Sequence, residues 1–80
     1  MRAAVRRLER VRIVQMDGCM AHVRGREQEG TVLDVKENRV YGDTQLRPWA
    51  TIRLDDGTVS ERCAELRNWV RHNGVMEYRL

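Results

Sequence analysis

The chain has no phenylalanine, one proline and two cysteines, and its only aromatic residues are Tyr41, Trp49, Trp69 and Tyr78. With so few rings, the core must be built mainly from Val, Leu, Ile, Met and Ala. We expect the two tryptophans to anchor this core, and we expect Trp49 and Leu54 to matter more for stability than any of the first ten residues. An 80-residue chain buries only about 60% of its unfolded surface, so we expect one small domain without a deep cleft.

Long apolar runs are also absent. No segment approaches the ~20 apolar residues of a membrane span. The first arginines are not followed by the roughly 7–15-residue apolar core of a signal peptide. We therefore expect a cytoplasmic protein without membrane contact, in which Cys19 and Cys63 are free thiols.

The motifs of catalysis and metal binding are missing as well. There is no phosphate-binding loop, nucleophile elbow or dinucleotide fingerprint. Cys19 and His22 have metal-ligand spacing, but Cys63 and His72 do not form the second tight pair of a structural zinc site. Asp55 and Asp56 directly precede Gly57, and this pattern is typical of a turn. The sequence thus predicts no enzyme, no cofactor and no metal.

Charge is abundant and unevenly placed. Residues 1–25 hold six arginines against two acidic residues, a net charge of +4, whereas residues 26–80 hold nine basic and ten acidic residues. Arginine suits phosphate because its planar fork donates two parallel hydrogen bonds. One interpretation is that these arginines only keep a small domain soluble. The other is a basic segment with an anionic partner, for which the candidate nucleic-acid-binding residues are Arg2, Arg6, Arg7, Arg10 and Arg12.

Short alternating runs predict a mainly β protein. We expect strands over residues 10–16, 20–25, 31–40 and 74–80, with a tight turn at Asp17-Gly18. The stretch "GREQEG", residues 25–30, predicts a polar loop, Asn38 is a turn candidate, and residues 41–48 are expected to be irregular. We divide the chain into residues 1–19, a basic N-terminal segment or first strand, and residues 20–80, a small β-barrel domain. Met20 remains an alternative to Met1 as the start of translation.

Residues 49–67, "WATIRLDDGTVSERCAELR", allow two interpretations. Ala50, Ile52 and Leu54 alternate as in a strand, and Asp-Asp-Gly then predicts a hairpin turn. A helix over residues 61–72 is the rival, with Ser60 as its cap, because apolar residues there also recur at helical spacing. Periodicity alone does not separate the two.

A resemblance favours the hairpin. The order "EGTVLDV", a longer loop, "WATIRLDDG", a short strand and then "AELR" resembles a small SH3-like barrel of the KOW and Tudor kind over about residues 20–72. The resemblance implies a short 3₁₀ or α-helical segment near residues 61–72. It also implies contacts to RNA or to protein partners in the KOW case, and an aromatic cage in the Tudor case. Tyr41 and Trp49 form a possible surface aromatic site, because Trp69 is assigned to the core.

We therefore expect a small non-enzymatic binding module that binds RNA or DNA through its basic N-terminal segment. The alternative is an adaptor for a protein partner, or a homo-oligomer, that pairs through exposed edge strands. The candidate edges are "VRIVQ", residues 11–15, and "VMEYRL", residues 75–80.

Overall fold

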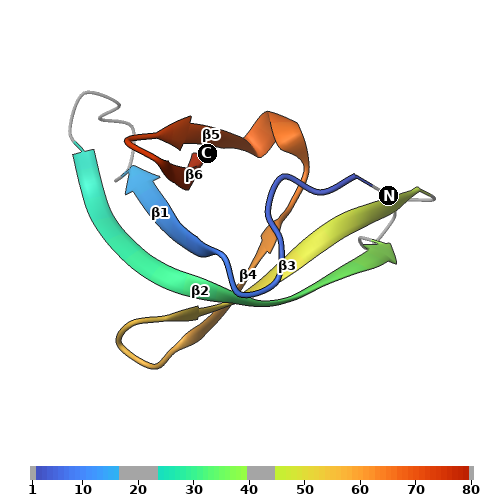
Figure 1. The fold of residues 1–80 in the computed structure, drawn as a ribbon, viewed down its shortest axis with the longest axis horizontal. Helices are drawn as coiled ribbons and strands as arrows, with labels where there is room; N and C mark the ends of the chain where they lie inside the picture. The colour runs from blue at the N-terminus through green and yellow to red at the C-terminus, as the bar shows by residue number, and fades with distance from the viewer. Residues whose placement is uncertain (1, 17–23, 40–44, 80) are drawn as a thin grey trace.

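The structure, a computed structural model, describes residues 2–16, 24–39 and 45–79. These residues form one six-stranded sheet and a single turn of 3₁₀ helix (Figure 1). The prediction of a mainly β protein is confirmed. No helix in the described part of the chain is long and apolar enough to span a membrane. The elements in chain order are β1 (Arg10–Met16), β2 (Arg24–Arg39), β3 (Leu46–Leu54), β4 (Val59–Cys63), η1 (Leu66–Asn68), β5 (Trp69–His72) and β6 (Val75–Arg79).

The strands lie in the order β4-β3-β2-β1-β6-β5. Neighbours are antiparallel apart from β1 and β6, which run parallel with Val11 opposite Met76 and Ile13 opposite Tyr78. The strands predicted over residues 10–16 and 74–80 are therefore confirmed. Both lie inside the sheet, so neither offers the free edge that was expected of it. The turn predicted at Asp17-Gly18 lies outside the described residues.

β2 overturns two predictions from the sequence. Residues 25–30 are not a loop and Asn38 is not a turn, because one strand of 16 residues runs through both and bends along its length (Figure 1). One half of β2 pairs with β1 and the other with β3, so each half has a ladder of backbone hydrogen bonds that does not depend on its side chains. The polar side chains of Glu27 and Glu29 are exposed on the outer face of the sheet, where water solvates them.

Gly30 explains why a glycine interrupts this strand. A Cβ at this position would lie 2.6 Å from the backbone oxygen of Arg53 and 2.9 Å from the side chain of Ile52. No other residue fits without moving β3. The glycine that suggested the end of a loop therefore marks a close approach of two strands.

Residues 49–67 form the hairpin, and the helix alternative is wrong. β3 and β4 pair antiparallel, and the turn between them is closed by the Thr58 oxygen accepting from Leu54 N–H at 2.8 Å. Gly57 has a φ of 93°, a left-handed conformation that glycine adopts without strain. Residues 61–72 contain the end of β4, η1 and β5, so the 3₁₀ option of the prediction is the correct one.

β3 also begins earlier than expected, at Leu46, so residues 46–48 are strand rather than irregular chain. Pro48 has no N–H to donate, but its carbonyl oxygen accepts a hydrogen bond from Ala64 N–H at 2.8 Å. This bond continues the contact between β3 and the chain just beyond β4. The proline is therefore buried within the strand rather than ending a loop.

One face of the curved sheet forms the core. Trp69 and Tyr78 pack within it, with ring centroids 5.2 Å apart in an edge-to-face arrangement. Trp49, by contrast, is half-buried on the opposite face of β3, so the expectation that it anchors the core is wrong. Its neighbours Ala50 and Ile52 take the inward positions. The core consists of Val5, Val11, Ile13, Val32, Ala50, Ile52, Leu54, Ala64, Trp69, Met76 and Tyr78.

Side-chain contacts join β4, at one edge of the sheet, to β5 and β6 at the other. The indole Nε1–H of Trp69 donates to the backbone oxygen of Cys63 at 2.8 Å. The guanidinium carbon of Arg62 lies 5.7 Å from the centroid of the Tyr78 ring, within the range of a cation–π contact. No backbone pairing between β4 and β5 occurs among the described residues.

Candidate nucleic-acid interface

The part of the predicted basic segment that precedes β1, residues 2–9 and from here on called the N-terminal segment, is folded against the rest of the protein. It runs beside the chain that joins β4 to η1 (Figure 1), and Ala4 N–H donates to the backbone oxygen of Ala64 at 2.8 Å. Val5 points into the core and is buried. The backbone that carries the charges of this segment is therefore held against the fold.

The segment ends in a β-turn, Arg6–Glu9, that precedes β1. Glu9 N–H donates to the backbone oxygen of Arg6 at 3.1 Å, and the Glu9 carboxylate accepts from Arg6 N–H at 3.1 Å. Two further bonds attach the turn to β2, from Leu8 N–H to the Val32 oxygen at 2.7 Å and from Val32 N–H to the Glu9 oxygen at 2.9 Å. The turn lies where the register of β2 shifts between Val32 and Asp34, so a β-bulge adjoins it.

Two of the five candidate arginines are engaged in ion pairs. Arg10 donates two hydrogen bonds to the Asp55 carboxylate at 2.8 and 2.7 Å, an arrangement that raises the pKa of Arg10 and lowers the pKa of Asp55. Arg12 donates to Glu77 and to Glu29, both at 3.1 Å. Their guanidinium groups face carboxylates of β2, β6 and the β3–β4 turn, so these arginines have structural partners.

The other three candidates, Arg2, Arg6 and Arg7, are exposed. No carboxylate of residues 2–16, 24–39 or 45–79 forms an ion pair with their guanidinium groups. A phosphate could therefore bind to them without displacing an existing partner.

Two arginines that the sequence analysis missed lie beside this segment. Arg71 of β5 is exposed, and with Arg6 it lines a shallow, mainly polar hollow of about 280 Å³ beside Glu9. Arg67 of η1 is also exposed, and its Nε lies 3.5 Å from the Glu65 carboxylate. No local pattern could have revealed this grouping, because it joins residues about 65 positions apart through the fold.

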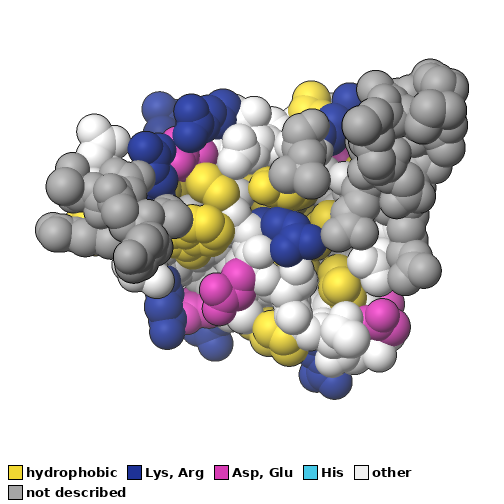
Figure 2. Space-filling model, turned by 180° about the vertical axis from the view of Figure 1, so that it is seen from behind, with side chains coloured by type: hydrophobic (Ala, Val, Ile, Leu, Met, Phe, Trp, Pro, Cys, Tyr) yellow, Lys and Arg dark blue, Asp and Glu magenta, His cyan; other side chains and the backbone are white. Residues whose placement is uncertain are grey.

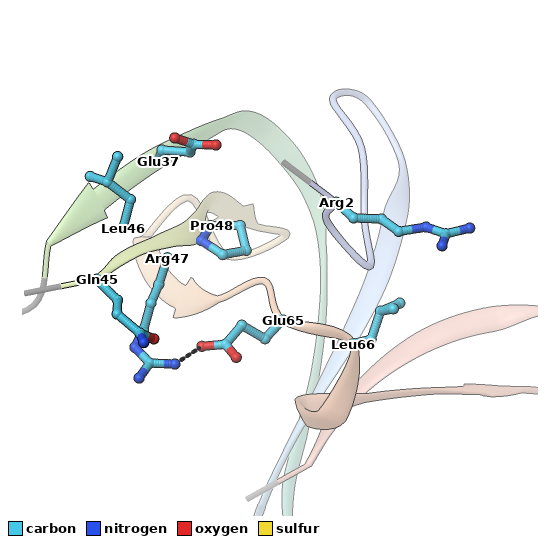
Figure 3. A pocket seen from close by; sticks show the side chains of 8 residues that line it. All are labelled: Arg2, Glu37, Gln45, Leu46, Arg47, Pro48, Glu65 and Leu66. Atoms are coloured by element: carbon cyan, nitrogen blue, oxygen red, sulfur yellow. Dashed lines mark hydrogen bonds and ion pairs between the residues drawn. The ribbon is translucent and has the colours of Figure 1, made fainter.

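A second hollow, of about 350 Å³, lies between the start of β3 and η1 (Figure 3). Arg47 donates to Glu65 at 2.8 Å within it, and this hydrogen bond is the first cause of the lowered pKa of Glu65. Leu46 and Leu66 are exposed at its rim. The Arg2 side chain points away from the ion pair, toward the outside of the hollow (Figure 3).

The structure gives little support to an aromatic site. Trp49 lies on the outer face of β3, where it is paired with Lys36 of β2 on one side and with Cys63 of β4 on the other. Tyr41 is outside the described residues. The described residues therefore provide one half-buried ring where a cage needs several.

The candidate metal ligands do not converge in the described residues. Cys63 is a free thiol whose pKa is raised by burial, and His72 lies 3.6 Å from Glu77. Cys19 and His22 lie outside the described ranges. Within those ranges, no three His, Cys, Asp or Glu side chains are placed to hold a metal ion.

Glu77 is the most unusual charged group of the outer face. Its side chain has no solvent-accessible surface, although it faces away from the apolar core. Arg79 Nε donates to it at 2.8 Å and Arg12 at 3.1 Å. Burial alone would raise the pKa of Glu77, but the hydrogen bonds from Arg79 and Arg12 outweigh it and lower the pKa.

Comparison of the chain with protein-family models, with curated proteins and with solved structures finds no match. The function must therefore be argued from the geometry of the molecule itself.

The backbone conformation of Leu8 in the turn Arg6–Glu9 predicts how a substitution there changes stability. Leu8 has a φ of 70°, and a non-glycine side chain in this left-handed region costs on the order of 1 kcal/mol. Replacing Leu8, which is exposed, by glycine should raise the free energy of unfolding by about 1 kcal/mol in urea denaturation. The matched control is Leu46→Gly, at another exposed leucine in ordinary strand conformation, which should lower stability by about 0.5–1 kcal/mol. Equal losses in both variants would contradict the strain argument.

Proposed function

We propose that this protein is a small non-enzymatic module that binds nucleic acid through a basic surface made of the N-terminal segment, η1 and β5. The observation that supports the proposal most directly is the exposure of Arg2, Arg6 and Arg7 without carboxylate partners among the described residues. Arg67 and Arg71 extend the surface. Its two nearby acids, Glu9 and Glu65, are partly buried and accept hydrogen bonds from within the protein.

The ion pairs of Arg10 and Arg12 indicate that these two arginines stabilise the fold, whereas other arginines are available to bind phosphate. These two connect β1 to Asp55, Glu29 and Glu77, and they would have to break those contacts to reach a phosphate. The proposed surface uses five arginines from three segments, namely Arg2, Arg6, Arg7, Arg67 and Arg71. Arg67 and Arg71 each lie beside one carboxylate, at 3.5 Å from Glu65 and 3.7 Å from Glu9, but their side chains are 71% and 60% exposed, so they can also reach a phosphate.

We also propose that the sheet is an SH3-like barrel of the KOW or Tudor kind. The supporting features are the 3₁₀ turn between β4 and β5, the Trp69–Cys63 hydrogen bond between these edge strands, and the cation–π contact from Arg62 of β4 to Tyr78 of β6. In such a barrel the basic surface would lie outside the apolar core.

Salt dependence tests the nucleic-acid proposal. If all five arginines contact phosphates of duplex DNA, the slope of log affinity against log salt should be about −4.5. The double variant Arg6→Gln/Arg7→Gln should flatten this slope by about 1.8 and weaken binding, as measured by fluorescence anisotropy on a labelled 20-bp duplex.

The matched control is Lys36→Gln/Arg53→Gln, which removes the same charge from exposed positions of β2 and β3. These residues lie on strands other than those of the proposed surface, so the slope should stay near the wild-type value. Equal flattening in the two double variants would show that only net charge matters. Failure of the wild-type protein to bind duplex DNA, single-stranded DNA or RNA at 50 mM salt would refute the proposed function.

A protein partner is the second candidate. It is supported by the free edges of β4 and β5 in the described sheet and by exposed Leu46 and Leu66 at the larger hollow. Figure 2 shows apolar side chains scattered between basic ones on the back of the molecule, a mixture found at many protein interfaces. Partners recovered from cell extract after nuclease treatment and at high salt would favour this candidate.

A further inference from the structure

The most exposed apolar side chain in the described residues sits at a strained position. Leu8 is 71% exposed and occupies the third position of the turn Arg6–Glu9 with a φ of 70°. Turns with a positive φ at this position ordinarily have glycine or asparagine there. Glycine would relieve the strain and remove an apolar side chain from water, so folding alone gives no reason for leucine.

The turn that presents Leu8 is rigid. Its two ends are joined by reciprocal hydrogen bonds between Arg6 and Glu9, and both Leu8 and Glu9 are bonded to Val32 of β2. Glu9 also pairs with Arg71 at 3.7 Å. A partner would therefore meet a leucine whose backbone is already ordered, and little backbone entropy would be lost on binding.

The surroundings of Leu8 indicate the chemistry of that partner. Arg6 and Arg7 immediately precede it, both exposed, and Arg71 lies beside the base of the turn. The only acidic side chain of the turn, Glu9, is held by Arg6 N–H and Arg71. A projecting apolar side chain flanked by cations suits a polyanion with an apolar interior, which describes the stacked base pairs of a duplex.

We propose that Leu8 acts as a wedge that enters between two base pairs of duplex DNA from the minor groove and bends the duplex, while Arg6, Arg7 and Arg71 bind the flanking phosphates. Apolar wedges of this kind partly unstack a base step and kink the DNA away from the inserted side chain. Pyrimidine–purine steps such as TA unstack most easily, so they should be preferred. This inference rests on the proposed function and specifies its substrate as deformable double-stranded DNA.

The test uses the full chain and a 20-bp duplex with 2-aminopurine, a base whose fluorescence rises on unstacking, at a central TA step. A second duplex carries a donor and an acceptor dye at its ends to report bending. The variant Leu8→Asn removes the apolar side chain but tolerates a positive φ, so the turn should keep its shape. Leu46→Asn changes an exposed leucine away from the turn and is the matched control.

The wild type and Leu46→Asn should raise 2-aminopurine fluorescence and shorten the end-to-end distance. Leu8→Asn should do neither and should bind about tenfold more weakly, while its salt slope stays unchanged. If Leu8→Asn unstacks and bends DNA like the wild type, the wedge is refuted but the phosphate-binding surface stands. If the wild type binds only single strands or RNA, the wedge is again refuted and the proposed function survives. If the wild type binds no nucleic acid, both fail.

Discussion

Replacing Trp69 by alanine is expected to lower the free energy of unfolding by about 3–5 kcal/mol. Trp69 is 7% exposed, its ring packs against Tyr78 at 5.2 Å, and its indole N–H bonds to Cys63. The substitution would leave a cavity in the core and remove the hydrogen bond between β4 and β5. Urea denaturation followed by circular dichroism measures the loss, which is a large part of the total stability of so small a domain.

A milder variant keeps this prediction testable if Trp69→Ala does not fold. Trp69→Phe retains an aromatic ring but loses the hydrogen bond to Cys63, so it should cost at least about 1 kcal/mol. The control is Trp49→Ala, at a half-buried position on the outer face, which should cost clearly less than Trp69→Ala. A larger loss at Trp49 than at Trp69 would reverse the assignment of the core tryptophan.

Local patterns predicted the parts of this fold that local chemistry determines. Asp55, Asp56 and Gly57 specify a turn because glycine supplies the positive φ and the Asp56 carboxylate accepts from Thr58 N–H at 2.9 Å. The alternation of Ala50, Ile52 and Leu54 likewise identified the buried face of β3. Each of these features depends on residues within a few positions of one another.

The mistaken predictions concern partners that are distant in sequence. The polar stretch of residues 25–30 belongs to a strand because β1 pairs with it, and Gly30 is required because β3 approaches it closely. Nothing local distinguishes Trp49 from Trp69, since their burial depends on which face of the sheet each strand presents to the core. The polar composition of residues 25–30 therefore did not predict that their backbone pairs with β1.

The candidate site shows the same limit. The sequence indicated a basic N-terminal segment, and three of its arginines, Arg2, Arg6 and Arg7, are exposed without a carboxylate partner among the described residues. It could not show that Arg10 pairs with Asp55, 45 positions away, or that Arg12 pairs with Glu77, 65 positions away. The strain at Leu8 was equally hidden, because a positive φ at leucine follows from how the turn is bonded to β2 rather than from its own preference.

The buried carboxylate of Glu77 leads to the second large expected effect. Glu77→Gln keeps the shape of the side chain but leaves Arg12 and Arg79 without the charge that they surround. Because hydrogen bonds between charged groups contribute roughly 1.5–3 kcal/mol each, the free energy of unfolding at pH 7 should fall by about 2 kcal/mol. Among the described residues, Arg12, Arg79 and His72 lie within 3.1, 2.7 and 3.6 Å of the Glu77 carboxylate.

The pH dependence of this loss distinguishes a charge effect from a packing effect. The pKa of Glu77 is lowered by folding from an ordinary value of 4.5, so its contribution to stability is fully present above pH 4.5 and is lost as the pH falls through the folded pKa. The difference between wild type and Glu77→Gln should therefore be largest near neutrality and shrink steadily below pH 4.5. Glu61→Gln, at an exposed position of β4, should match the wild type throughout. A deficit of Glu77→Gln that stayed constant down to pH 2 would mean that the amide disturbs packing and that the Glu77 charge contributes little.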